Sequence, residues 1–369
     1  MRIVALQVEG ARNLARVQLT PGPRFNVFYG DNGQGKTNLI ETVYVLATLR
    51  SFRTARLAEL VTLGGTRTAM AARVVRADTE RRYDVVLEPP RRQVLLDGKP
   101  VRPLARYFGG WNVVLFAPED LLVARGAPAE RRRFLDRTVF ARQPSYLGVA
   151  QDFDKVLRSR NAVLRQLADG DRRAAAMLPV YDAQLAPLAV AVAAARRALI
   201  AELAPRFTAG FEAITRTGLT VAARHDTAPE LAAGDVAAVL AGLQRDQAKD
   251  VARGSTSLGP HRDDLGFVLS GQPAAQYASQ GQLRALVLAW KIAELDLLRL
   301  VHGEPPILLL DDVSSELDDE RNLHLFEYLT AHEHQCFITT THPRHVILTR
   351  DRVDHEVRGG VISRVDPAG

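Results

Sequence analysis

Residues 30–37 read Gly30-Asp31-Asn32-Gly33-Gln34-Gly35-Lys36-Thr37, which matches the G-x-x-x-x-G-K-[ST] pattern of a phosphate-binding loop. A short β-like run, Phe25–Tyr29, precedes the pattern, and apolar residues recur at helical spacing from Lys36 onward. A strand, a glycine-rich turn and a helix therefore follow one another, which is the context that the pattern requires. The segment predicts an α/β fold built around a phosphate site.

Each residue type in this loop has a physical reason to bind phosphate. Glycines let backbone N–H groups approach the phosphates closely, and the N-terminus of the following helix adds positive potential. Lys36 is expected to reach the terminal phosphates of a nucleotide, and the Thr37 hydroxyl is expected to bind Mg²⁺. The loop therefore predicts a nucleotide and Mg²⁺ as cofactors.

A second motif supplies the carboxylates that such a site needs. Asp311 and Asp312 follow the run Ile307–Leu310, which is apolar enough to be a strand buried on both faces. Asp311 is expected to hold Mg²⁺. Asp312 is expected to orient and deprotonate the attacking water, with the alternative that it only supports the residues that do so.

The two motifs lie far apart in the chain, and one βαβ unit of about 30 residues does not account for the separation. From about Ala129 the sequence turns into long Arg-rich and Ala-rich helical stretches, and strand-like segments resume near Leu265. We therefore expect a helical arm domain inserted into an α/β domain. The expected ranges are 1–128 for the first half of the α/β domain, 129–250 for the arm and 251–369 for the second half.

The coarse pattern also gives individual elements. The region before the arm is expected to form one mixed sheet with a hairpin at Asp97-Gly98. Helices are expected over residues 130–140, 146–168, 172–207, 236–248 and 282–300, and strands over 3–8, 16–20, 25–29, 69–75, 83–87, 94–96, 113–116, 219–223, 265–269 and 307–310.

Composition limits the class of protein. The 369 residues include 48 Lys and Arg and 42 Asp and Glu, so the formal net charge is +6. A basic chain fits a polyanionic partner, but a GC-rich genome that favours Arg and Ala codons gives the same balance. The single cysteine, Cys336, excludes an intrachain disulfide and lies in an apolar string, so we expect it to be buried. No signal-peptide run and no uninterrupted membrane span is found, and a cytoplasmic location is expected.

Further motifs carry a resemblance to a known superfamily. The cap Ser279-Gln280-Gly281-Gln282 before a helix resembles the signature motif of ABC ATPases, and Ser315-Glu316-Leu317-Asp318 resembles their D-loop. His342, after Thr339-Thr340-Thr341, stands where their switch histidine lies, although a surface or capping histidine is an equal alternative. The resemblance implies an ABC-type ATPase head and a head-to-tail dimer, in which the signature of one copy caps the ATP held by the other.

Within that superfamily the chain resembles the bacterial RecF family over nearly its whole length. The resemblance rests on Arg12-Asn13, Ser51-Phe52-Arg53-Thr54, Pro118-Glu119-Asp120-Leu121, the segments 130–136 and 258–265, and the motifs above. It implies an ATP-dependent clamp, associated with the nucleoid, that grips duplex and gapped or single-stranded DNA and works with the RecR and RecO proteins to load the recombinase. It also adds Arg12, Asn13 and Asn38 to the expected nucleotide site.

A DNA clamp needs basic side chains that contact the phosphate backbone. The expected contacts are Arg50, Arg53, Arg56, Arg131, Arg132 and Arg158, and for each the alternative is a solvated surface residue.

Two departures from the superfamily limit what the resemblance implies. The first lobe has no clear Q-loop glutamine, so the link between the nucleotide and the arm is unassigned. Asp312 stands where a longer glutamate is usual, and we therefore expect slow hydrolysis. Stimulation of this hydrolysis by DNA is what the resemblance implies.

Three other classes of protein fit the sequence less well. A transporter's ATPase subunit disagrees with the long arm and the missing glutamine, and a long coiled-coil chromosome protein disagrees with an arm that lacks sustained heptads. A DNA clamp in which ATP is only structural disagrees with the retention of both Asp311 and Asp312.

Overall fold

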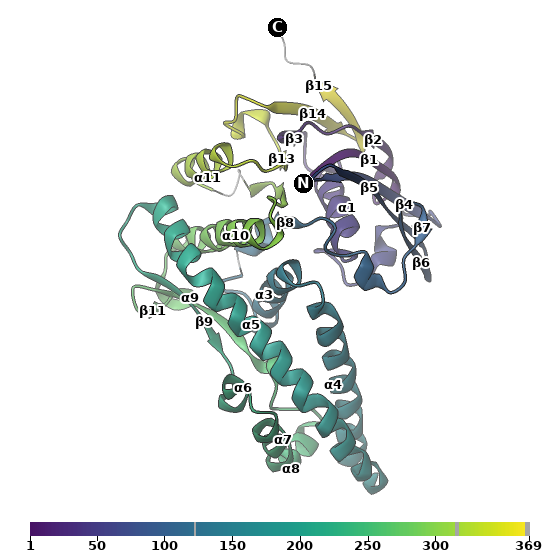
Figure 1. The fold of residues 1–369 in the computed structure, drawn as a ribbon, viewed down its shortest axis with the longest axis vertical. Helices are drawn as coiled ribbons and strands as arrows, with labels where there is room; N and C mark the ends of the chain where they lie inside the picture. Colours follow the sequence, from purple (N-terminus) through teal and green to yellow (C-terminus); the bar gives the residue numbers. More distant parts are fainter. Residues whose placement is uncertain (122, 314–316, 366–369) are drawn as a thin grey trace. The chain divides into compact units, whose positions relative to one another are not determined.

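The computed structural model describes residues 1–121, 123–313 and 317–365 (Figure 1). The chain divides into two compact units, and each is treated by itself. The first unit contains Met1–Leu121, Gly210–Thr217 and Gln280–Gly369, and the second contains Leu122–Ala209 and Gly218–Ser279. The phosphate loop and the acidic strand both belong to the first unit, so the expected nucleotide site can be examined within one unit.

A largely parallel sheet brings the site residues to one edge. Its strand order is β15-β14-β3-β13-β12-β8, with only β15 antiparallel. The register pairs Tyr29 of β3 with Thr340 of β13, Thr339 of β13 with Asp311 of β12, and Leu310 of β12 with Phe116 of β8. Because parallel strands share the edge at which they end, the phosphate loop and Asp311 meet there. The strands span Phe25–Tyr29 (β3), Val113–Phe116 (β8), Ile307–Asp311 (β12), Cys336–Thr340 (β13), Arg352–Arg358 (β14) and Val361–Val365 (β15).

The expected mixed sheet is confirmed by the sheet above, which carries the phosphate loop, whereas the other strands before the second unit form a separate antiparallel sheet. Its order is β2-β1-β4-β5-β6-β7. In β5, Tyr83, Val85 and Leu87 are buried and alternate with more exposed residues, as expected for a sheet with one face in the core. Hairpin geometry at Asp97-Gly98 is confirmed by positive φ at both residues. The strands are Arg2–Ala11 (β1), Leu14–Leu19 (β2), Thr68–Arg76 (β4), Thr79–Glu88 (β5), Arg91–Leu96 (β6) and Lys99–Pro100 (β7).

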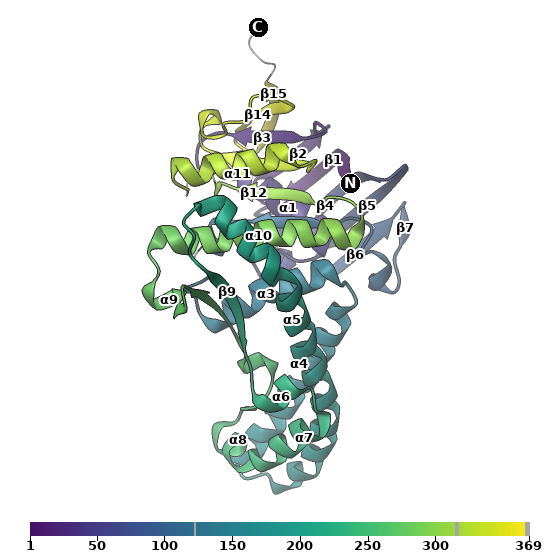
Figure 2. The same ribbon diagram turned by 60° about the vertical axis from the view of Figure 1, so that its left-hand side comes forward.

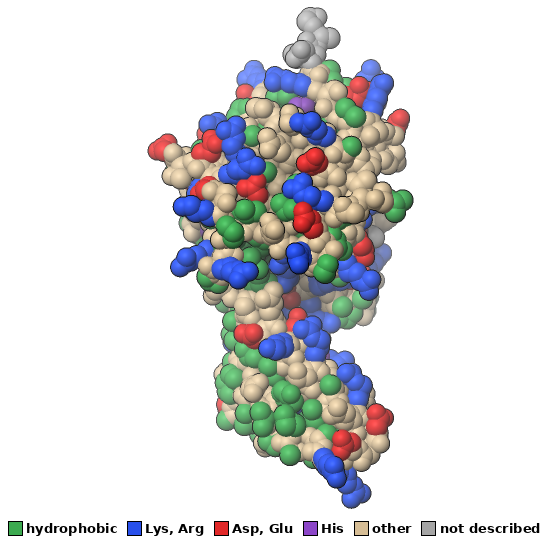
Figure 3. Space-filling view, turned by 90° about the vertical axis from the view of Figure 1, so that its right-hand side faces the viewer, with side chains coloured by type: hydrophobic (Ala, Val, Ile, Leu, Met, Phe, Trp, Pro, Cys, Tyr) green, Lys and Arg blue, Asp and Glu red, His purple; other side chains and the backbone are tan. Residues whose placement is uncertain are grey.

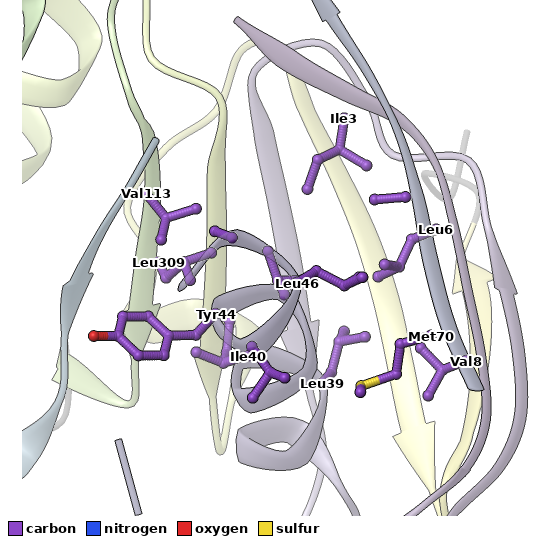
Figure 4. Packing of buried hydrophobic residues seen from close by; sticks show 14 of the residues in the cluster. Ile3, Leu6, Val8, Leu39, Ile40, Tyr44, Leu46, Met70, Val113 and Leu309 are labelled. Carbon is purple, nitrogen blue, oxygen red and sulfur yellow. The ribbon is translucent and has the colours of Figure 1, made fainter. Parts of the chain in front are cut away.

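Helix α1, Lys36–Thr48, fills the space between these sheets. Figure 4 shows Leu39 near Leu6, Val8 and Met70 of the antiparallel sheet, while Tyr44 lies toward Val113 and Leu309 of the parallel sheet. The labelled side chains are at most 6% exposed. Burial of this kind stabilises the unit by roughly 1.5–3 kcal/mol for each large apolar side chain. The helix that opens at the phosphate loop is therefore fixed by the core.

Two longer helices and several short ones complete the first unit. Helix α10, Gln280–His302, is buried along most of its length and joins α11, Asp319–Ala331, through a hydrogen bond from Tyr328 Oη to Asp296 Oδ1 at 2.7 Å. Both helices lie side by side in two views (Figures 1 and 2). The short helices are Leu57–Leu60 (η1), Leu104–Arg106 (η2), Pro118–Leu121 (α2) and Pro343–His345 (η6). Cys336 is fully buried, as expected.

The second unit is mainly helical and has a small antiparallel sheet, β11-β10-β9. Its core includes charges that neutralise each other: the Arg160 guanidinium lies 2.6 Å from Asp182 Oδ1 and 2.8 Å from Asp250 Oδ2. The helices are Pro128–Arg142 (α3), Tyr146–Ala168 (α4), Arg172–Met177 (η3), Leu178–Thr215 (α5), Pro229–Ala233 (α6), Val236–Arg245 (α7), Gln247–Arg253 (α8), Pro260–Arg262 (η4) and Ala274–Tyr277 (α9), and the strands are Val221–Asp226 (β9), Asp264–Leu269 (β10) and Gln272–Pro273 (β11). Helix α5 continues into the first unit from Gly210 onward.

Most expected elements differ from the structure in their exact bounds, and three of the differences change the description of the second unit. The helix expected over 236–248 is two helices separated at Asp246. The helix expected over 172–207 begins as a 3₁₀ turn and runs on to Thr215. The strand expected over 219–223 begins and ends later, because it pairs with β10 from Val221 to Asp226. Local periodicity does not contain such tertiary pairing. The boundaries given above for the inserted arm, residues 129 and 250, stay a prediction.

One stretch, Arg172–Thr215, is long and apolar enough to cross a membrane by length and composition alone. Within it Arg196 is 5% exposed and paired with Asp136 at 2.8 Å, while Leu199 and Leu203 are fully buried. Apolar helices in protein cores pass the same test, and 33% of the most apolar window of this stretch is buried.

Candidate nucleotide-binding site

The phosphate loop leaves β3 and enters α1 through glycines in conformations that other residues rarely adopt. Gly30, Gly33 and Gly35 have φ values of 153°, 80° and 117°. A Cβ on Gly30 would lie 2.3 Å from the carbonyl oxygen of Val357, so the backbone of β14 also requires glycine there. Asp31, Asn32 and Gly33 are exposed, as a ligand-facing loop requires.

Lys36 lies buried beneath this loop, with 6% of its surface exposed. Its Nζ donates to the carbonyl oxygens of Gly30 at 2.6 Å and Asp31 at 2.8 Å. Burial lowers the pKa of the Lys36 amine, and the nearby carboxylates of Asp312, Asp311 and Asp31 act in the opposite direction. Among the residues that the structure describes, Lys36 forms no ion pair, so its charge is available to a phosphate.

Asp311 and Thr37 form the expected metal position. Thr37 Oγ1 donates to Asp311 Oδ1 at 2.9 Å, and Thr339 Oγ1 donates to the same oxygen at 2.8 Å. Burial raises the pKa of the Asp311 carboxyl, which is 4% exposed, although the two hydroxyls act against this shift. A bound cation would relieve the cost of burying this charge.

The oxygen ligands fit Mg²⁺, which is bound in proteins by one or two carboxylates together with substrate phosphates. The described residues contain no cluster of three or more His, Cys, Asp or Glu that could hold a metal without further ligands. Thr37 and Asp311 are therefore suited to a metal that arrives with a nucleotide.

Asp312 follows the strand end in a left-handed conformation, with φ of 50°. Its backbone N–H donates to Thr339 Oγ1 at 3.0 Å, so Thr339 orients both acidic residues. A non-glycine residue in this conformation is strained, and such strain is concentrated at functional sites. The geometry is consistent with a role for Asp312 in directing a water molecule.

A polar network beside the loop includes three more of the expected residues. Asn38 Nδ2 donates to Asn13 Oδ1 at 2.7 Å, and Asn13 Nδ2 donates to the carbonyl oxygen of Gly33 at 3.2 Å. Arg12 donates from Nε and Nη2 to the two oxygens of Glu41, both at 3.1 Å. Asn13 and Asn38 thus lie against the phosphate loop, and Arg12 is fixed by a carboxylate of α1 that the sequence analysis did not single out.

The sequence analysis also missed a contact with the C-terminal hairpin. Gly360 N donates to the carbonyl oxygen of Gln34 at 2.8 Å, and Gly359 N donates to Gln34 Oε1 at 2.6 Å. A Cβ on Gly360 would lie 2.0 Å from the carbonyl oxygen of Asn13. The Gly-Gly pair between two strand-like runs was the available signal, but nothing in the local sequence shows which loop it contacts.

The expected signature residues begin α10. Gln280 is exposed, Gly281 and Gln282 are half-buried, and Ser279 immediately precedes the helix in the chain. Asp318 caps α11 by accepting from Arg321 N at 3.0 Å. Ser315 and Glu316 of the expected D-loop lie outside the described residues.

His342 caps a short helix. Its Nδ1 accepts from Arg344 N at 3.1 Å, and its side chain is exposed. His342 therefore acts as a helix cap, which was one of the two alternatives given for it. Its Nε2 is the ring nitrogen that could bind a ligand.

Comparison with known proteins adds independent evidence, although no family model matches the chain. The chain is 45% identical to the DNA replication and repair protein RecF of Myxococcus xanthus, over 92% of this chain and 91% of the relative. It is 44% identical to the protein of that name from Anaeromyxobacter sp. strain Fw109-5, over 98% and 99% of the two chains. The chain belongs to the RecF family.

Solved structures agree with this assignment. The structure of the recombination mediator protein RecF-ATPrS in the RecFOR pathway matches with a TM-score of 0.89 and 26% identity, over 99% of this chain and 98% of that one. The Smc head domain with an extended coiled coil from Pyrococcus furiosus matches with a TM-score of 0.55 and 15% identity, over 98% and 95% of the chains, which shows likeness of fold alone. The predicted α/β class and ABC-type head are confirmed.

No clear Q-loop glutamine is present in this RecF-family chain, and two acidic residues of α2 lie near the metal position and the signature helix. Strand β8 ends beside β12, and Glu119 follows on α2, close enough for its charge to raise the pKa of Asp311. Asp120, also on α2, lies 3.9 Å from the buried Lys291 Nζ of α10. Helix α2 therefore connects the metal position with the signature helix through carboxylates.

The six arginines expected to contact DNA differ in how they are engaged. Arg50, Arg56 and Arg158 are exposed. Arg53 donates to Asn38 Oδ1 at 2.7 Å and therefore lies beside the phosphate loop. In the second unit Arg131 pairs bidentately with Asp264, both contacts at 2.6 Å, and Arg132 donates to the carbonyl oxygen of Asp263 at 2.8 Å.

Basic side chains do not form one continuous stripe on the face that Figure 3 shows. In the first unit several exposed arginines pair with carboxylates at the antiparallel sheet, such as Arg73 with Glu80 and Arg81 with Asp97. Exposed ion pairs of this kind leave less charge for a polyanion. This face therefore does not identify a DNA surface by itself.

Proposed function

We propose that the chain is an ATP-dependent DNA-binding protein of recombinational repair and replication restart, with weak Mg²⁺-dependent, DNA-stimulated ATPase activity. One observation carries the proposal: Lys36, Thr37 and Asp311 converge on the phosphate loop in the arrangement that a nucleotide and its metal require. The family assignment and the RecF-ATP structures among its structural neighbours support ATP as the nucleotide.

In the proposed site the backbone N–H groups of the phosphate loop and Lys36 bind the β- and γ-phosphates. Thr37 and Asp311 hold Mg²⁺, which neutralises charge that develops on the phosphates. Asp312 orients the water and accepts its proton, and Asn13, Asn38 and Arg12 support the loop. His342 is proposed to face the γ-phosphate through Nε2.

The proposed active form is a head-to-tail dimer. The signature segment, Ser279 to Gln282, and Asp318 of one copy would cap the ATP bound by the other, so that dimerisation is linked to nucleotide by mass action. ATP closes this clamp and hydrolysis opens it. The support is the family assignment together with the exposed position of Gln280 at the start of α10.

The closed dimer is proposed to bind duplex and gapped or single-stranded DNA and to act with RecR and RecO in loading the recombinase. The RecFOR pathway named for a structural neighbour supports these partners, and Arg50, Arg56 and Arg158 are the preferred DNA contacts because they are exposed. A cytoplasmic location follows from this role. Asp312 is one methylene shorter than glutamate, so slow hydrolysis is expected, and turnover of tens per second would contradict it.

Sedimentation velocity tests the proposal. Wild type, Lys36→Arg and the control Lys249→Arg, an exposed lysine in the second unit, are compared with and without Mg-ATP and gapped duplex DNA. We expect wild type and the control to dimerise with ATP and to bind DNA more tightly, and Lys36→Arg to stay monomeric. A wild-type protein that stays monomeric in all conditions would exclude the clamp.

A further inference from the structure

A second group of cations lies at the start of the signature helix, beside Gly281 and Asp318. Gly281 has no side chain, and the guanidinium of Arg321 occupies the adjacent space: a Cβ on Gly281 would lie 3.2 Å from Arg321 Nη1 and 3.5 Å from Cζ. Arg321 comes from the first turn of α11, where Asp318 accepts from both its backbone N–H and its guanidinium. A residue of α11 is thus positioned against the N-terminus of α10.

Arg321 has a second cation as a neighbour in addition to the carboxylate of Asp318. Burial lowers the pKa of its guanidinium, and the neighbouring Arg284 of α10 lowers it further. The N-terminus of α10 adds the positive end of a helix dipole. Arginine stays protonated in proteins, so the repulsion between the two guanidinium groups costs free energy. A bound anion would lower that cost.

Hydrogen bonding points the same way. Arg321 Nε is buried and has no hydrogen-bond partner among the residues that the structure describes. Asp318, whose side chain is 50% exposed, pairs with the guanidinium of Arg321 through Nη1 and leaves Nε without a partner among these residues. A buried donor without a partner costs free energy, and planar guanidinium groups are suited to bidentate binding of phosphate.

We propose that Arg321, with Arg284 beside it, binds the terminal phosphate of the ATP held by the phosphate loop of a second copy of the chain. The inference rests on the proposed head-to-tail dimer, in which the start of α10 faces the partner's nucleotide. Arg321 then stabilises the negative charge that develops on the phosphate oxygens during attack by water. A Cβ on Gly281 would press against the guanidinium and shift it slightly, so glycine favours the observed position of Arg321.

The decisive experiment mixes two inactive variants, Arg321→Gln and Lys36→Met, and measures phosphate release with gapped DNA. A mixed dimer has one site with both substitutions and one site with neither, because Arg321 acts on the partner's nucleotide. We expect each variant alone to lose at least about 10-fold in turnover. The equal mixture should release phosphate faster than the sum of the two variants measured separately, because each mixed dimer has one complete site.

Recovery of activity on mixing supports action across the dimer, and no recovery, with mixed dimers shown by pull-down of differently tagged chains, overturns it. Arg299→Gln, an exposed arginine at the other end of α10, is the control and should retain wild-type turnover. Arg321→Gln should bind ATP as wild type does at protein concentrations too low for dimerisation, which a folding defect would not allow.

Two further outcomes are distinguishable. If wild type itself does not dimerise with ATP, the proposed function fails before this inference is reached. If Arg321→Gln instead weakens DNA binding without nucleotide, and mixing restores nothing, the anion is a DNA phosphate and the proposal is wrong.

Discussion

Arg160 in the second unit and Lys36 in the first are both buried cations, with 0% and 6% of their surfaces exposed. Arg160 is enclosed by the carboxylates of Asp182 and Asp250 and also donates to Thr256 Oγ1 at 2.9 Å. Lys36 instead donates to two backbone carbonyl oxygens, and among the residues that the structure describes the buried Asp311 side chain accepts from two threonine hydroxyls.

The difference separates a structural charge from a charge that awaits a ligand. A buried ion pair with all its hydrogen bonds made is stable only as a complete set, because removing one member leaves an uncompensated charge. The charges of the nucleotide site are held in place by neutral groups, which orient them without neutralising them. They are therefore available to phosphate and Mg²⁺.

The largest effect is expected at Arg160. Arg160→Met leaves Asp182 and Asp250 buried without their cation and should lower the free energy of unfolding by about 3–5 kcal/mol. Urea denaturation monitored by circular dichroism measures it. Arg158→Met removes an exposed arginine two residues earlier on α4 and should change stability by less than about 0.5 kcal/mol. Equal losses in the two variants would show that the buried cluster is not special.

A smaller effect is expected where the first unit positions its phosphate loop by backbone contact. Gly360→Ala places a Cβ against the carbonyl oxygen of Asn13, in addition to the strain of its φ of 80°. We expect a loss of about 2 kcal/mol or more and weaker ATP binding by calorimetry. Gly359→Ala is the matched control, since its φ is also positive at 55° but its Cβ meets nothing within 4 Å. Its cost should be about 1 kcal/mol, and unchanged ATP affinity in both variants would exclude a role for the hairpin.

Lys36→Met should have little effect on the protein without nucleotide. The lost hydrogen bonds to Gly30 and Asp31 are offset because an ammonium group no longer has to be buried, so the unfolding free energy should change by less than about 1 kcal/mol. The rise in melting temperature that Mg-ATP gives the wild type should disappear. A large loss of stability without ATP would place Lys36 with Arg160 among the structural charges.

The smallest effect is expected for Asp311→Asn, and it has the opposite sign. The pKa of Asp311 is raised in the folded protein, so its ionised form costs stability above that pKa, and the cost is relieved as the pH falls through it. Asparagine keeps an oxygen that accepts from Thr37 and Thr339. Without nucleotide the variant should therefore melt slightly higher than wild type at pH 7, and the difference should vanish in acid. A lower melting temperature at pH 7 would contradict the assignment of Asp311 as an unneutralised charge.

Local pattern predicted the elements whose signal lies within a few residues. The phosphate loop, α1 and the apolar strand before Asp311 were found because each has its own periodicity or glycine spacing. The antiparallel sheet, the place of Glu119 beside Asp311 and the contact of Gly360 with Gln34 were not found. Each depends on pairing between distant segments, and the hydrogen bond from Gly359 to Gln34 joins residues 325 positions apart. Likewise, the sequence could not show that Glu41 engages Arg12 and Arg53, because three separate elements meet there.

Amide hydrogen exchange of the wild type with and without Mg-ATP tests the central claim most directly. ATP should slow exchange at residues 33–37 at any protein concentration, and at residues 280–284 only at concentrations where the protein dimerises. The amides around Arg160 should not change, because that cluster needs no ligand. Unchanged exchange at residues 33–37, or protection at 280–284 that persists at concentrations where the protein is a monomer, would contradict the account.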